Sequence, residues 1–188
     1  MLSTVAKFII TFFKIKTNRL ISKGKNYIGF DVKFVNRGII KLGDSVIIRP
    51  STRVYAGNSH SLVFFGDGTE IGEHSTISSN NRVVFGNDVL TGPHVFIADH
   101  NHAYENPHIP ISKQGVKCHP MDEVVIGEGS WVGTNVVVVG NVHIGKHCVI
   151  GANSVVTKDI PDYSVAAGIP AKVIKKYDFE KCEWVKVK

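Results

Sequence analysis

Three of the four histidines in the polar stretch over residues 98–123 are His100, His102 and His108. A neutral imidazole is the usual side chain for accepting a proton near neutral pH, so each of the three is a candidate general base. The default for a histidine in a surface loop is simple solvation. However, long irregular loops inside compact domains are usually functional, and we therefore expect this stretch to contribute to a site.

A zinc site is the alternative use of these histidines. His94, His100 and His102, with His119, could be drawn as ligands, provided that three of them converge on one point. No spacing among them demands this arrangement. We therefore expect no metal site, and we keep a metal-binding protein as an alternative.

The residues on either side of this stretch show a six-residue period, which indicates how the loop is positioned. After the stretch, one aliphatic residue recurs in every six: Ile126, Val132, Val138, Ile144, Ile150 and Val156. Glycine follows four of them, at Gly127, Gly133, Gly145 and Gly151. Small or β-branched residues stand two positions earlier: Val124, Ser130, Val136, Val142, Cys148 and Ser154. The pattern predicts short strands in a triangular prism, with the aliphatic residues inside and the glycines near the turns.

The N-terminal half follows the same period less regularly. Its inward positions are Leu42, Ile48 and Val54, then Phe65, Ile71 and Ile77, then Phe85, Thr91 and Ile97. An excursion around Asn58 to Leu62 separates the first two groups, and a widened corner at Ser79–Asn81 accounts for the second shift of register. Residues 98–123 must leave the prism, because nothing in them can line its core. We count about five coils altogether.

Composition favours one globular domain. The chain has 188 residues, of which 43% are hydrophobic and 20% charged. The three cysteines, Cys118, Cys148 and Cys182, form no disulfide framework, which predicts free thiols in a reducing compartment. The net charge of +6 is concentrated at the two ends of the chain and suits phosphate groups. Neither an aromatic platform nor a recognition helix accompanies it, so we expect no nucleic-acid partner.

Residues 1–25 are predicted to form an amphipathic helix. Val5, Phe8, Ile9 and Phe12 share one helical face, and the segment contains six basic residues and no acidic one. The apolar run is too short to span a bilayer, which needs ~20 apolar residues. Such a helix packs on the main body or on a neighbouring subunit, or it rests on a membrane surface through its basic rim.

Three blocks of sequence, together with the repeat, resemble the hexapeptide-repeat acyltransferases. They are the motif at 131–133 (WVG), the run at 151–161 (GANSVVTKDIP) and the motif at 167–172 (AGIPAK). The nearest relatives suggested are galactoside, maltose and xenobiotic acetyltransferases and O-acetyltransferases of bacterial surface polysaccharides. The resemblance implies an all-β fold, a left-handed parallel β-helix, with residues 26–176 as the acyltransferase domain, the loop 98–123 extruded and residues 177–188 as a C-terminal extension.

The resemblance also implies site residues. Asp99-His100 matches the position of the family's catalytic base, so His100 is preferred over His102. Asp99 either orients the imidazole ring or caps backbone amides. The positions that match the family's binding site for acetyl-CoA are Trp131, Thr134, Ala152, Thr157, Lys158, Lys172 and Lys175.

The expected function is the transfer of an acetyl group from acetyl-CoA to a hydroxyl of a carbohydrate acceptor, in surface polysaccharide biosynthesis. The resemblance further implies a homotrimer with each active site between two subunits. We expect a cytoplasmic enzyme, with contact to the inner membrane surface as an open alternative. N-acetylation of an amino sugar, or a metal-binding β-helix of the γ-carbonic anhydrase type, would also fit the repeat.

Overall fold

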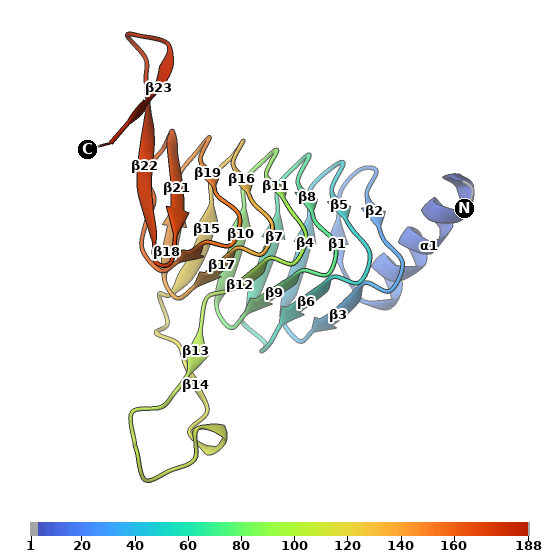
Figure 1. The fold of residues 1–188 in the computed structure, drawn as a ribbon. Coiled ribbons are helices and arrows are strands. Elements are labelled where there is room, and N and C mark those ends of the chain that lie inside the picture. The colour runs from blue at the N-terminus through green and yellow to red at the C-terminus, as the bar shows by residue number, and fades with distance from the viewer. Residues whose placement is uncertain (1–3, 188) are drawn as a thin grey trace.

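The chain folds into a triangular prism of short parallel strands (Figure 1). The computed structural model describes residues 4–187. Three sheets form the sides of the prism, which we call faces A, B and C. Face A contains β1 (Ile21–Ser22), β4 (Ile39–Leu42), β7 (Leu62–Phe65), β10 (Arg82–Phe85), β15 (Glu123–Ile126) and β18 (Val142–Ile144). Face B contains β2 (Tyr27–Ile28), β5 (Ile47–Ile48), β8 (Glu70–Ile71), β11 (Leu90–Thr91), β16 (Trp131–Val132), β19 (Val149–Ile150) and β21 (Ser164–Gly168). Face C contains β3 (Lys33–Asn36), β6 (Arg53–Ala56), β9 (Thr76–Ser79), β12 (Phe96–Ala98), β17 (Val137–Val139) and β20 (Val155–Val156).

The predicted class, a left-handed parallel β-helix, is confirmed, but the predicted count of about five coils is too low. Faces A and C each contain six strands, and an isolated bridge from Ile144 to Ile160 followed by β21 begins a seventh coil. The first coil, β1 to β3, was missed because the pattern requires an aliphatic residue at each inward position. In β1 that position is Ser22, which is in register with the inward-facing Leu42.

The inward residues form continuous ladders along the prism. On face B the ladder consists of Ile28, Ile48, Ile71, Thr91, Val132, Ile150 and Ala166. All of the predicted inward aliphatic residues are buried, as is Cys148 at its predicted core position. On face A, the rings of Phe65 and Phe85 stack with their centroids 5.0 Å apart. The six-residue period therefore identified the core correctly wherever it was clear.

The glycines that follow the inward residues are required by close approach between coils. A Cβ added at Gly127 would lie 2.5 Å from the carbonyl carbon of Gly145 in the next coil, which a real side chain could not do. The left-handed backbone falls two residues later, at Gly129, with φ of 66°. Of the two reasons expected for these glycines, close approach is the one that applies at Gly127.

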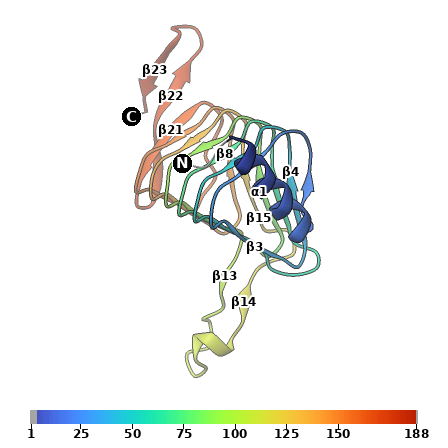
Figure 2. The same cartoon turned by 90° about the vertical axis from the view of Figure 1, so that its right-hand side faces the viewer.

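The irregular insertions described next leave the prism at one corner, the one between face C and face A. Residues 57–61 join β6 to β7, and Asn80 and Asn81 join β9 to β10, where the widened corner was expected. Residues 99–122 join β12 to β15 and project from the prism (Figures 1 and 2). This extruded loop contains a two-stranded antiparallel ribbon, β13 (Asn101–His102) and β14 (Val116–Lys117), and a 3-10 turn at Ile111–Lys113.

The N-terminal helix α1 (Thr4–Thr17) lies across the end of the prism (Figure 2). It is shorter than the predicted 1–25, because the chain enters the first coil at Ile21. Thr11 is 3% exposed, and its hydroxyl accepts a hydrogen bond of 3.0 Å from the backbone N–H of Ile28. Ile9 and Phe12 are exposed, so packing on the body of the same chain, one of the placements left open for this apolar face, does not apply to these two residues. The side chains of Val5 and Phe8 lie outside the described residues.

The C-terminal segment closes the opposite end. β21 pairs with β22 (Ala171–Asp178) and β22 with β23 (Glu183–Lys186), both antiparallel, and the last two strands extend beyond the prism (Figure 1). Cys118, Cys148 and Cys182 are free thiols. Among residues 4–187, no helix is both long and apolar enough to cross a membrane.

Candidate active site

The widened corner between β9 and β10 binds one carboxylate, that of Asp99. Asp99 directly follows β12, one coil further along, and its side chain is 0% exposed. Its oxygens accept hydrogen bonds from the backbone N–H groups of Asn80 (2.8 Å), Asn81 (2.8 Å) and Arg82 (2.6 Å), and from the hydroxyl of Ser79 (2.9 Å). This corner therefore holds the first residue of the extruded loop in place.

The same carboxylate orients the imidazole of His100. Oδ1 of Asp99 lies 2.8 Å from Nδ1 of His100. Burial by itself raises the pKa of Asp99, but the hydrogen bonds from His100, from the backbone of Asn80 and Asn81 and from Ser79 outweigh it and hold this pKa below its ordinary value. An ionised carboxylate only accepts hydrogen bonds, so Nδ1 carries the hydrogen and the lone pair of the neutral ring is on Nε2. Asp99 thus both caps backbone amides and orients the ring.

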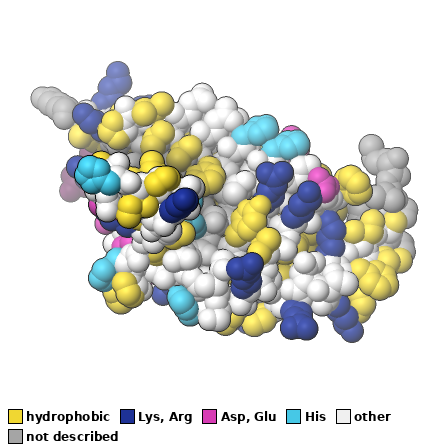
Figure 3. Space-filling view, turned by 90° about the horizontal axis from the view of Figure 1, so that it is seen from below, with side chains coloured by type: hydrophobic (Ala, Val, Ile, Leu, Met, Phe, Trp, Pro, Cys, Tyr) yellow, Lys and Arg dark blue, Asp and Glu magenta, His cyan; other side chains and the backbone are white. Residues whose placement is uncertain are grey.

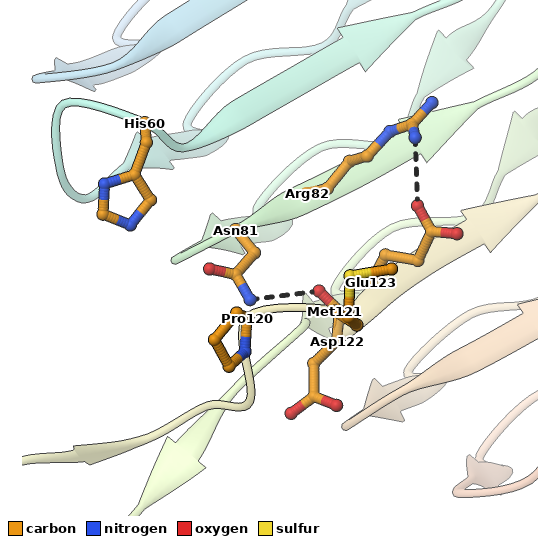
Figure 4. A pocket seen from close by; sticks show the side chains of 7 residues that line it. All are labelled: His60, Asn81, Arg82, Pro120, Met121, Asp122 and Glu123. Carbon is orange, nitrogen blue, oxygen red and sulfur yellow. Dashed lines mark hydrogen bonds and ion pairs between the residues drawn. The ribbon is translucent and has the colours of Figure 1, made fainter.

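Two cavities flank the base of the extruded loop. The first, of about 230 Å³, is lined by His100 (21% side-chain exposure) together with Asp99, Asn101, Tyr104, Lys117, Asp122 and Gly140. The second, of about 410 Å³, is shown in Figure 4 and is lined by His60, Asn81, Arg82, Pro120, Met121, Asp122 and Glu123. Arg82 and Glu123, which are in register on β10 and β15, form an ion pair of 3.3 Å. A reacting group next to His100 would lie in the first cavity.

Asn81 holds the returning arm of the loop and was not singled out in the sequence. Its side-chain amide donates hydrogen bonds to the backbone oxygens of His119 (2.6 Å) and Asp122 (3.3 Å). The outgoing arm, at Asp99, and the returning arm are therefore both bound to the corner at 79–82. In the sequence, the only indication of this corner was the extra pair of residues that shifts the six-residue period.

The other histidines lie elsewhere. His102 on β13 and His108 in the loop are exposed, while His94 stacks on His74 with ring centroids 5.1 Å apart. The backbone N–H of Met121 donates to Nδ1 of His119 at 3.2 Å. Within residues 4–187, no three His, Cys, Asp or Glu side chains are gathered closely enough to hold a metal ion.

Four of the seven residues predicted to bind acetyl-CoA fall at the two edges of face C. Thr134 and Ala152 lie at the corner between faces B and C in successive coils, where the backbone N–H of Asn153 donates to the oxygen of Thr134 at 2.9 Å. Thr157 and Lys158 follow β20, at the same corner as His100. The final coils therefore place these residues on both sides of one face.

Trp131, Lys172 and Lys175 belong to face B and its antiparallel continuation. Trp131 is exposed and lies in register with Val149, then Val165, and Val165 pairs with Lys175. Lys172 pairs with Ala167. Within one chain, Trp131 on face B is on the opposite side of the prism from the corner that carries His100.

Comparison with known proteins identifies the family. The family model described as bacterial transferase hexapeptide (six repeats) matches residues 123–158. The chain is 35% identical over 172 residues to the protein named Putative lipopolysaccharide biosynthesis O-acetyl transferase WbbJ of Escherichia coli K12, covering 89% of this chain and 87% of WbbJ. The chain belongs to the hexapeptide-repeat acyltransferases. It is an acetyltransferase.

Two further matches agree with this family. A galactoside O-acetyltransferase of Lactococcus lactis is 37% identical over 136 residues, which is 72% of this chain and 62% of that protein. Among solved structures, a point mutant of AntD, an N-acyltransferase from Bacillus cereus in complex with dTDP and coenzyme A, superposes with a TM-score of 0.69 at 17% identity and covers 90% of each chain. The AntD likeness shows the shared fold.

Proposed function

We propose that this hexapeptide-repeat acetyltransferase transfers the acetyl group of acetyl-CoA to a hydroxyl of a carbohydrate, with His100 as the general base. The observation that carries the proposal is the Asp99–His100 pair at the mouth of a cavity. Nε2 of His100 accepts the proton of the hydroxyl as its oxygen attacks the thioester carbon. The new C–O bond forms, the C–S bond breaks, and the proton passes from Nε2 to the departing thiolate.

The names of the relatives support oxygen rather than nitrogen as the acceptor atom. WbbJ and the Lactococcus lactis protein are both named as O-acetyl transferases, one of lipopolysaccharide biosynthesis and one of galactosides. We therefore propose a carbohydrate of a bacterial surface polysaccharide, or its precursor, as the acceptor. The free thiols fit a cytoplasmic location.

The proposed acetyl-CoA site requires a second subunit. Trp131 lies on face B, whereas His100, Thr157 and Lys158 lie at the corner between faces C and A. A residue on face B reaches a site at that corner only if it comes from a neighbouring protomer. We therefore propose a cyclic homotrimer in which face B of one protomer faces the loop corner of the next.

The direct test is an assay of acetyl-CoA consumption with a panel of sugars and amino sugars. We expect acetyl transfer to a sugar hydroxyl, giving an ester product that mild base hydrolyses. A base-stable amide as the main product would replace the O-acetyl proposal by N-acetylation. Release of free CoA at the same rate with and without every acceptor would contradict both.

The two lysines near the end of face B give a second expected result. Replacement of Lys172 and Lys175 together by alanine should raise KM for acetyl-CoA by roughly tenfold, because their ammonium groups are proposed to pair with the cofactor's phosphates. Steady-state kinetics with each substrate varied in turn measures this. Lys176 and Lys186, both exposed, serve as a matched control pair. A comparable change in the acceptor KM would argue against this placement.

A further inference from the structure

The face of α1 that points away from the prism is its apolar one. Ile9 is 51% exposed, Phe12 54% and Phe13 61%. These three residues, which we call the outer helix face, fall on one side of a helix with 3.6 residues per turn. The centroid of the Phe12 ring lies 6.1 Å from that of Phe13. The fold therefore places three large apolar side chains in contact with water.

The opposite face of the helix is bound to the prism, so the outer helix face cannot simply rotate inward. The buried Thr11 hydroxyl binds the N–H of Ile28, and Nζ of Lys14 donates to the oxygen of Gly29 at 2.7 Å. Ile15 packs against the core. Turning the helix by half a turn would break both hydrogen bonds and bury the aromatic rings where a threonine now fits.

One basic residue on α1 and three that follow it in the chain are exposed. Lys16, Arg19, Lys23 and Lys25 are all exposed, and the first acidic residue of the chain is Asp31. Nζ of Lys16 lies 4.9 Å from the centroid of the Phe12 ring, so its stem follows the apolar surface while its charge reaches water. Figure 3 shows hydrophobic side chains at the right-hand end of the molecule, with Lys and Arg side chains beside them.

We infer that the outer helix face and these four basic residues dock on the surface of an anionic lipid bilayer. Aromatic and aliphatic side chains enter the boundary between headgroups and acyl chains, and the basic residues are attracted to anionic headgroups. A contact between two copies of this surface would instead bring like charges together. The inference rests on α1 and the basic residues that follow it, and it is independent of the proposed reaction.

The experiment is flotation of the full-length protein with phosphatidylcholine vesicles that contain or lack phosphatidylglycerol. We expect the protein to float only with phosphatidylglycerol, and less at high salt, because salt screens the attraction. A variant with Phe12→Gln and Phe13→Gln should bind at least about tenfold more weakly, because it removes the apolar contact. Lys23→Gln with Lys25→Gln should weaken binding by about fivefold for each residue, since each basic residue near the surface contributes independently.

Matched controls come from the other end of the molecule. Ile169→Gln with Phe179→Gln replaces two exposed apolar residues, and Lys176→Gln with Lys186→Gln replaces two exposed lysines; neither pair should change flotation. Sedimentation of the Phe12/Phe13 variant should give the wild-type mass. Absence of wild-type flotation, equal flotation with neutral vesicles, or a lower mass for that variant would overturn the inference, and the last would identify a second copy of the chain as the occupant. The lysine variants test it even if the aromatic variant fails to fold.

Discussion

Replacement of His100 by alanine is expected to lower kcat by about 10²-fold or more. The variant removes the only proposed acceptor for the hydroxyl proton, whereas the Asp99 carboxylate keeps its hydrogen bonds to the corner at 79–82. The thermal unfolding midpoint and the affinity for acetyl-CoA should therefore stay close to wild type. Steady-state kinetics, calorimetry of acetyl-CoA binding and a melting curve on the same sample measure these three quantities.

His102→Ala is the matched control, because His102 lies two residues further on and is exposed on β13. It should retain wild-type kcat, and a reversal of the two results would move the base from His100 to His102.

Mixing His100→Ala with Trp131→Ala chains tests the trimer in the same assay. Activity should return on subunit exchange, since each repaired site takes His100 from one protomer and Trp131 from its neighbour. No recovery after proven exchange would contradict the shared site.

Asp99→Asn is expected to lower both kcat and stability. An amide of the same shape presents N–H groups toward a corner that already supplies three backbone N–H donors and a hydroxyl. Hydrogen bonds to a charged acceptor are worth ~1.5–3 kcal/mol each, so we expect the free energy of unfolding to fall by about 3 kcal/mol. Because the ring of His100 also loses the acceptor that fixes its tautomer, kcat should fall by at least about tenfold.

The pH dependence separates the charge of Asp99 from its shape. Its pKa in the folded protein is lowered, so its contribution to stability is present above its unfolded pKa of about 3.9 and is lost as pH falls through the lower folded value. The difference in unfolding free energy between wild type and Asp99→Asn should therefore be largest at neutral pH and decrease below about pH 4. Denaturant titrations at several pH values measure it. A difference independent of pH would show that only the shape of the side chain matters.

The six-residue period was enough to predict the prism, because each inward position faces the same ladder in every coil. Thr91 illustrates how robust the signal is: it stands in register with Val132 in the next coil and is buried without being aliphatic. The period failed where polar residues replace the aliphatic ones, as at Ser22, and the first coil was missed for that reason. It also gave the position of the extruded loop: the predicted range 98–123 exceeds the observed range 99–122 by one residue at each end, because Ala98 ends β12 and Glu123 begins β15.

The candidate site was only partly predictable. Asp99 and His100 are neighbours in sequence, so their hydrogen bond could be anticipated. The binding of Asp99 by the backbone of Asn80 and Asn81 depends on stacking between coils, which sequence adjacency does not encode. The sequence left the orientation of α1 open for a related physical reason: Thr11 is weakly polar, but here its hydroxyl satisfies a backbone N–H at the end of the prism, where no further coil supplies an acceptor.

The position of the insertions determines which parts of the chain can change in length during evolution without disturbing the core. Residues 57–61, Asn80 and Asn81, and residues 99–122 all begin after one strand of face C has ended and finish before the next strand of face A begins. Lengthening any of them leaves every ladder of the core in register, since each coil is already fixed by the coil before it. Most residues that line the cavity beside His100 belong to the extruded loop, whereas the buried ladders belong to the coils. The loop can therefore change in length or sequence while the scaffold stays the same.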